Sequence, residues 1–303
     1  SRGLGDVYKR QKLMKPTQQI PGVYHRRIGD IVVTCIADGY LDGVMTVVQG
    51  LAPEESTRIL AENRRPARRT SVNCFIIHSA GRIALVDNGS GNKMQASCGQ
   101  LLKNLAAAGI APKDVDTLMQ THMHPDHSNG LTDDNGKAVF PNAELVLHED
   151  EIRHWHDDGA ASRVDETSRL RNFIHAREQF APYKDRAKPF SKSTEVFPGV
   201  TAMPIPGHTP GHTGYMISSG NESLFIWGDI IHVPEIQVPF PTVTMAFDVD
   251  PDQARATRSR VFDMVATDRL LIGGMHVHFP GLARLARREA GYHLLNEPWV
   301  HYF

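Results

Sequence analysis

The sequence predicts an α+β protein in which two β-sheets pack against each other and helices cover their outer faces. Short apolar runs rich in β-branched residues, such as residues 31–36, are typical of buried strands. Helix signals lie between these runs, such as the proline and two glutamates that begin at Pro53. The predicted elements come in the order strands, helix, strands, helix. This order is expected for two packed sheets with outer helices.

The first half of the chain contains most of the expected strands. Two apolar runs flank a turn at Gly81 and predict a hairpin whose second strand is followed directly by Asp87. A later strand runs directly into a His-rich segment, which therefore begins at a strand's carboxyl end, where open α/β sheets place ligands. The strands expected in this half are residues 31–36, 75–77, 83–86, 115–120 and 143–147.

The second half continues the alternation. Asp250 and Pro251 form a favourable N-cap and first residue for a helix that extends to Met264. Residues 215–217 and 224–227 should pair as strands, and a strand at residues 270–272 follows the helix.

The domain organisation predicted from these segments is simple. Residues 1–20 are polar and basic without periodicity and are expected to form an N-terminal arm. Residues 21–303 are expected to form a single domain, and the polar helical stretch at about residues 149–190 is expected to form a cap on it. No second domain or solenoid repeat is indicated.

Composition and charge favour a soluble globular protein with a small-molecule substrate. Hydrophobic residues make up 41% of the chain and charged residues 22%, and the formal net charge is -1. This balance predicts no nucleic-acid or anionic-membrane partner. The three cysteines are widely separated and do not suggest a disulfide framework. No secretory signal is recognised, so a cytoplasmic location is predicted, and because the chain starts at Ser1, a processed periplasmic or secreted protein is the alternative.

The segment from Thr121 to His127 contains three histidines and one aspartate. Imidazole nitrogen and carboxylate oxygen are ligands that suit zinc and neighbouring metals. With 16 histidines in the chain, chance clustering is the alternative. An ordered series of further motifs argues against chance: residues 86–89 (Val-Asp-Asn-Gly), 207–212 (Gly-His-Thr-Pro-Gly-His), 227–229 (Trp-Gly-Asp) and 274–281 (Gly-Met-His-Val-His-Phe-Pro-Gly).

This series resembles the metallo-β-lactamase superfamily over roughly residues 70–290. Within it, the chain is most similar to the branch of methyl parathion hydrolase and related lactonases, because of residues 21–24 (Pro-Gly-Val-Tyr), 140–143 (Phe-Pro-Asn-Ala) and 279–281 (Phe-Pro-Gly). The resemblance implies a four-layer αββα sandwich of two mixed sheets with outer helices, and it also suggests a homodimer.

The resemblance also implies a site for two divalent metal ions, with zinc the favoured metal. One ion would be held by His122, His124 and His208, the other by Asp126, His127 and His276, with Asp229 as a bridge. Ions about 3.5–4 Å apart can share a water that is activated to hydroxide. Asp126 would also be catalytic, because it can orient that hydroxide or take its proton.

Two positions leave alternatives. His212 lies in the same loop as His208, and the family pattern favours His208 as the ligand and a structural role for His212. His278 follows His276 by two residues, and strand alternation cannot choose between them. The spacing to the Phe-Pro-Gly segment favours His276.

Three further residues receive roles from the resemblance. Asp87 is expected to organise the loop beneath the site by hydrogen bonds instead of binding metal. Trp155 and Phe173 are expected to bind substrate, although packing is the common role of such residues.

The predicted function is a dinuclear metal-dependent hydrolase that uses a metal-bridging hydroxide to cleave a small ester, lactone or phosphotriester. A glyoxalase-II-like thioesterase or a β-lactamase on the same scaffold is an alternative. A mononuclear iron persulfide dioxygenase is another, and metal stoichiometry would separate it from a hydrolase.

Overall fold

The computed structural model describes residues 15–65 and 67–301. Most of the arm predicted for residues 1–20 lies outside the described residues, and residues 15–20 are exposed and form no helix or strand. None of the described helices has the length and hydropathy that crossing a membrane requires.

The first sheet is formed almost entirely by the N-terminal half. Its order is β1-β2-β4-β5-β6-β7-β8. Pairing is antiparallel from β1 to β5 and parallel from β5 to β8, so the sheet is mixed. Its strands are β1 (Val23–Ile28), β2 (Ile31–Gly43), β4 (Arg68–Ser79), β5 (Arg82–Val86), β6 (Thr117–Met119), β7 (Glu144–His148) and β8 (Ala187–Phe190).

The second sheet is formed by the C-terminal half in the order β16-β15-β14-β12-β11-β10-β9. Only the β12–β14 pair is parallel, because α9 connects these two strands. Its strands are β9 (Thr194–Phe197), β10 (Val200–Pro204), β11 (Thr213–Ser219), β12 (Glu222–Ile226), β14 (Leu271–Gly273), β15 (Leu282–Arg287) and β16 (Tyr292–Asn296). A small antiparallel pair joins β3 (Val48–Gln49) to β13 (Thr244–Met245).

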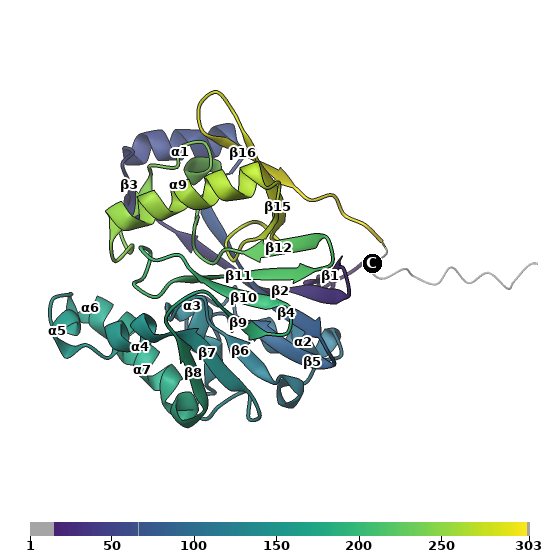
Figure 1. Cartoon of the computed structure of the whole chain (residues 1–303). Coiled ribbons are helices and arrows are strands. Elements are labelled where there is room, and N and C mark those ends of the chain that lie inside the picture. The colour runs from purple at the N-terminus through teal and green to yellow at the C-terminus, as the bar shows by residue number, and fades with distance from the viewer. Residues whose placement is uncertain (1–14, 66, 302–303) are drawn as a thin grey trace, which may run out of the picture.

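Helices cover the outer face of each sheet, which confirms the predicted αββα sandwich. Figure 1 shows α9 (Pro251–Thr267) along one side of the molecule and the cap helices on the opposite side. The cap comprises α4 (Glu149–Trp155), α5 (Asp158–Ala161), α6 (Glu166–Ser168), a π-helix (Arg169–Ile174), α7 (His175–Phe180) and a 3-10 helix (Ala181–Arg186). The other helices are α1 (Pro53–Glu62), α2 (Leu101–Ala107), α3 (Pro125–Ser128) and α8 (Pro234–Gln237).

Three buried clusters correspond to the three interfaces between the layers. Between the sheets, Phe75 of the first sheet belongs to the same core as Tyr215 of the second. Leu105 of α2 belongs to the core on the outer face of the first sheet, and Phe262 of α9 to that on the second. Burial of these faces supplies most of the favourable free energy of such a sandwich.

The end of the cap differs from the prediction. Residues 187–190 were expected in the helical cap, but they form β8, which pairs in parallel with residues 145–148 of β7. This edge strand contains Pro189, a residue that argues against a strand in sequence but is tolerated where no ladder donor is needed. The paired residues are about 40 positions apart in the sequence, so no local sequence pattern predicts the pairing.

Candidate metal centre

Loops at the ends of strands in both sheets form a single His- and Asp-rich centre. The segment after β6 carries His122 and His124 and leads into α3, which begins at Pro125, a favourable first residue. The second sheet contributes one residue after each of β10, β12 and β14. The groups that could hold an ion include all seven predicted ligands: His122, His124, Asp126, His127, His208, Asp229 and His276.

The first group consists of three buried histidines. Nδ1 of His124 lies 3.0 Å from Nε2 of His122 and 2.9 Å from Nε2 of His208. An ion bonded tetrahedrally to nitrogen at 2.0–2.1 Å holds its ligand atoms roughly 3.3 Å apart. Burial foremost lowers the pKa of His122 and of His124 well below the ordinary value, which favours the neutral form that binds metals. The group therefore fits a cation.

The second group contains Asp126, His127 and His276. The Oδ2 atom of Asp126 lies 3.6 Å from Nε2 of His127 and 3.5 Å from Nε2 of His276. Nε2 of His127 is buried and has no hydrogen-bond partner. A buried polar atom without a partner is costly, and a cation at this position would remove that cost.

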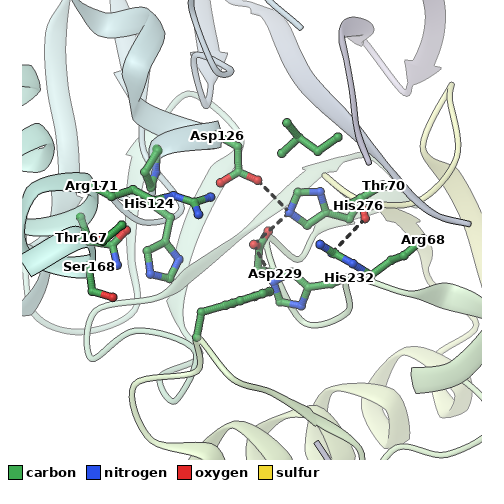
Figure 2. Close-up of a pocket in the computed structure, with 14 residues that line it drawn as sticks. Arg68, Thr70, His124, Asp126, Thr167, Ser168, Arg171, Asp229, His232 and His276 are labelled. Atoms are coloured by element: carbon green, nitrogen blue, oxygen red, sulfur yellow. Dashed lines mark hydrogen bonds and ion pairs between the residues drawn. The ribbon is translucent and has the colours of Figure 1, made fainter. Parts of the chain in front are cut away.

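Figure 2 shows Asp229 between His124 of the first group and His276 of the second. Its Oδ2 atom is 3.4 Å from Nε2 of His208 in the first group and 3.2 Å from Nε2 of His127 in the second. Its other oxygen, Oδ1, is buried without a hydrogen-bond partner. Burial opposes ionisation, but nearby imidazoles, those of His127 and His276 foremost, hold the pKa of Asp229 well below its usual range. An ionised carboxylate therefore faces both groups.

Outer hydrogen bonds fix the orientation of the histidine rings. Nδ1 of His127 donates to Asp87 at 2.7 Å, and Nδ1 of His208 donates to Asp248 at 2.7 Å. Nδ1 of His276 donates to the Ser71 carbonyl at 2.8 Å. Each ring thereby points its Nε2 atom toward the candidate ion, as metal-binding histidines usually do.

His212 lies outside the ligand groups and supports Asp229. Its Nδ1 donates to the Ile205 carbonyl at 3.1 Å, and its Nε2 accepts the backbone N–H of Asp229 at 2.9 Å. Burial lowers the pKa of His212 to about 3, which keeps the ring neutral and able to accept. A methyl group on Gly228 would lie 2.4 Å from Nε2 of His212, so this approach requires a glycine.

The structure distinguishes the roles of His276 and His278. Both follow β14, in a segment that forms no strand, so the alternation assumed in the sequence does not apply. His276 lies in the centre, whereas Nε2 of His278 lies 2.8 Å from Oε1 of Glu235.

A cavity of about 210 Å³ opens beside the centre, and its residues differ from those predicted to bind substrate. Trp155 and Phe173 are 2% and 3% exposed and do not line it. Trp155 instead packs 5.4 Å from the His124 ring and donates its indole N–H to Glu151 at 2.7 Å. Phe173 packs against Trp155 with ring centroids 5.0 Å apart, so both aromatic residues belong to the core. The lining is Leu41, Arg68, Thr70, His124, Pro125, Asp126, Thr167, Ser168, Arg171, Asn172, Asp229, His232, Phe247 and His276.

Sequence reasoning missed His232. Its Nε2 atom lies 2.9 Å from Oδ2 of Asp229, and it forms a further group with Asp229 and His208. The one available signal was its position three residues after Asp229. Arg68 and Arg171 of the cavity were also missed, because each comes from an element distant in sequence from the motifs.

The geometry agrees with the comparison to known families. Residues 67–276 match the Metallo-beta-lactamase superfamily. The chain belongs to that superfamily. The match includes all seven predicted ligands and both sheets' contributions to the centre.

Individual relatives of this superfamily member include lactonases. An N-acyl homoserine lactonase from Bacillus thuringiensis is 24% identical over 177 residues, which cover 57% of this chain and 60% of the relative. The uncharacterized protein YobT from Bacillus subtilis (strain 168) is 23% identical over 48% of this chain and 56% of its own length. The chain thus spans less than two thirds of the length of these curated relatives.

Solved structures match over nearly the whole chain. The hydrolase AbOPH of the beta lactamase superfamily has a TM-score of 0.87 and 28% identity, covering 93% of this chain and 100% of AbOPH. AidC, a dizinc quorum-quenching lactonase solved with the product N-hexnoyl-L-homoserine, has a TM-score of 0.87 and 25% identity, covering 93% of this chain and 99% of AidC.

Proposed function

We propose that this protein is a dinuclear metal-dependent hydrolase that cleaves a small ester, lactone or phosphotriester. The observation that carries the proposal is the position of Asp229, whose Oδ2 atom lies within 3.4 Å of a ring nitrogen in each ligand group. A carboxylate in this position can bridge two ions. Because two relatives are lactonases and AidC is a dizinc enzyme, lactones are the first substrates to test and zinc is the favoured metal.

The ligand assignment in this proposal follows the two groups. His122, His124 and His208 would hold one ion, Asp126, His127 and His276 the other, and Asp229 both. When bound, two such ions lower the pKa of a shared water and stabilise negative charge that develops on the substrate.

Asp126 is the proposed catalytic residue. It lines the cavity and keeps 17% of its side chain exposed, whereas the Asp229 side chain is 2% exposed. Burial opposes its ionisation, but His127 and His276 lower the pKa of Asp126 below the ordinary value, so it is a carboxylate at neutral pH. Asp126 can therefore orient the attacking water and accept its proton while it faces the substrate.

His232 has a positioning role in the same proposal. Its Nε2 atom is 2.9 Å from Oδ2 of Asp229, and burial lowers the pKa of His232 to about 4. A neutral ring can donate one N–H to the carboxylate. This bond would fix the Asp229 side chain, while His212, which does not line the cavity, accepts the Asp229 backbone N–H.

The test is metal content by elemental analysis of protein purified without chelator, followed by a screen of lactones, aryl esters and phosphotriesters. We expect about two zinc ions per chain, loss of hydrolysis when a chelator removes them, and recovery on zinc addition. Asp229→Ala should lose both the metal and the hydrolysis.

Either of two results from the metal analysis would overturn the proposal. One is a single iron per chain together with oxygen consumption on a persulfide, which would identify a dioxygenase. The other is unchanged metal content in Asp229→Ala, since a bridging carboxylate cannot be removed without loss of ions. Efficient cleavage of thioesters or β-lactams alone would support the proposed metal centre and contradict the proposed substrate class.

A further inference from the structure

Two arginines line the cavity and belong to none of the candidate ligand groups. Arg68 begins β4 in the first sheet, and Arg171 belongs to the π-helix of the cap. We propose that Arg68 and Arg171 bind a carboxylate on the part of the substrate that is not cleaved, so that the enzyme acts on anionic esters or lactones. This inference rests on the proposed function, because it concerns the substrate of the same site.

The environment of Arg68 leaves most of its donors free for a ligand. Nε donates to the Val44 carbonyl at 3.2 Å, and one terminal nitrogen lies at a long 3.5 Å from the Thr70 hydroxyl. Within the described part of the chain, Arg68 forms no ion pair with a carboxylate. A guanidinium carries five N–H donors and stays charged in proteins. The carboxylate that attracts Arg68 electrostatically is Asp126, a candidate metal ligand that forms no ion pair with it. A half-buried guanidinium in this position is suited to an incoming anion.

The fold makes room for this guanidinium. A methyl group on Gly43, at the end of β2, would lie 1.6 Å from a terminal nitrogen of Arg68. The side chain therefore packs directly over the backbone of the neighbouring strand. Its position beside the cavity is fixed by packing and does not depend on an acidic partner.

Arg171 differs from its neighbours in the cap. Arg169 pairs with Glu166 at 2.7 Å, and Arg177 pairs with Asp158 at 2.8 Å. Arg171 has no such partner among the described residues, and it lines the cavity together with Asn172. It lies in a π-helix, a conformation often found at functional sites.

The charges of the cavity wall favour an anion. The carboxylates among the described lining residues are Asp126 and Asp229, and both belong to the candidate ligand groups. Figure 2 shows these carboxylates between Arg171 on one side and Arg68 on the other. Bound divalent ions would neutralise the carboxylates, which leaves the two guanidinium groups without a counterion. Planar guanidinium groups match carboxylates, and also phosphates, through paired N–H···O bonds.

A matched pair of substrates tests this inference. The 4-nitrophenyl monoester of glutaric acid carries a free carboxylate, and its methyl ester is the neutral counterpart of nearly equal size. Hydrogen bonds to a charged group contribute enough to predict a preference of about tenfold or more in kcat/KM for the acid, expressed mainly in KM. In Arg68→Gln and in Arg171→Gln, the ratio of acid to methyl ester should fall toward one. Arg169→Gln, in the same segment but outside the cavity lining, should keep the ratio of the unmodified protein.

Direct binding gives a second readout that does not depend on turnover. Calorimetric titration of glutarate into the metal-loaded protein should give a Kd that rises about tenfold in Arg171→Gln and not in Arg169→Gln. Titration of inorganic phosphate tests whether the two arginines bind a phosphate instead of a carboxylate. Tighter, Arg171-dependent binding of phosphate than of glutarate would overturn the assignment to a carboxylate.

The outcomes distinguish this inference from the proposed function. Metal-dependent cleavage of both esters with no preference for the acid, or a preference that survives both arginine substitutions, would overturn the inference and leave the hydrolase proposal intact. Glutarate binding that requires Arg171, without hydrolysis of any ester, lactone or phosphotriester, would support anion recognition and overturn the hydrolase proposal.

Discussion

The Nδ1 atom of His127 donates a 2.7 Å hydrogen bond to the buried carboxylate of Asp87. The same arrangement occurs in the other ligand group, where His208 donates to Asp248 over the same distance. Each candidate ion therefore has one imidazole that is oriented by an aspartate outside the ligand set. Asp87 follows β5 of the first sheet, whereas Asp248 follows β13 of the small antiparallel pair. The two groups are therefore anchored from different parts of the fold.

Removal of either aspartate should lower the binding affinity for one ion more than for the other. Asp87→Ala is expected to lower the affinity of the group that contains His127, and Asp248→Ala that of the group that contains His208. Loss of such outer partners costs about 10–100-fold in metal affinity. Zinc titration against a competing chelator, with two affinities resolved per chain, measures the effect.

Asp38→Ala controls for loss of a buried carboxylate as such. Asp38 is 0% exposed and accepts backbone N–H groups from Ser90 and Leu101, without contact with a predicted ligand. Its replacement should lower the free energy of unfolding and leave both zinc affinities within about threefold. Equal loss of both ions in all three variants would contradict this separate anchoring of the two groups.

His276 and His278 provide a second matched pair. His276→Ala should reduce zinc content from about two ions per chain to about one, because His276 belongs to the group of Asp126 and His127. His278→Ala should keep both ions, since this ring contacts Glu235 outside the centre. Elemental analysis decides, and the reverse pattern would exchange their assignments.

Glu151, in α4 of the cap, accepts hydrogen bonds from the two loops that carry His124 and His208. Its carboxylate is buried and accepts the backbone N–H groups of Met123 and Gly211, each at 3.0 Å, and the indole N–H of Trp155. In Glu151→Ala, three donors lose their acceptor, which should lower the free energy of unfolding by about 3 kcal/mol or more. Urea unfolding of the zinc-loaded protein measures this loss.

Glu149→Ala is the control for Glu151, because it changes an exposed glutamate on the same helix. Surface substitutions of this kind change the unfolding free energy by about 0.5 kcal/mol or less. Comparable stability of the two variants would show that Glu151 does not hold the cap in place.

The sequence predicted the parts of the fold and site that local spacing encodes. Apolar runs located β5 and β12, and the loop after β6 carries His122 and His124 within three residues of each other. The sandwich and the seven candidate ligands that the structure brings together were implied by the family resemblance, which the order of these motifs carries.

Contacts that arise only in three dimensions were not predicted. Glu151 and Arg68 lie on elements that reach the centre through packing, and nothing in their own sequence neighbourhood marks them. Trp155 illustrates the same limit, because its burial beneath His124 depends on how α4 packs against the loop. Aromatic side chains have similar signals in sequence whether they line a cavity or fill a core.

Glu235 predicts how stability depends on pH away from the metal centre. Burial alone would raise its pKa, but the hydrogen bonds with His278 and Arg65 lower the pKa of Glu235 from 4.5 to about 2. Because the folded pKa lies below the unfolded one, the added stability is complete above about pH 4.5 and is lost as the pH falls toward 2. At 1.36 kcal/mol per pKa unit, the difference corresponds to about 3 kcal/mol. The free energy of unfolding of the zinc-free protein should therefore exceed that of Glu235→Gln by a margin that shrinks by this amount between pH 6 and pH 2. A margin that is constant over this range would show that Glu235 has the same pKa in the folded and unfolded states.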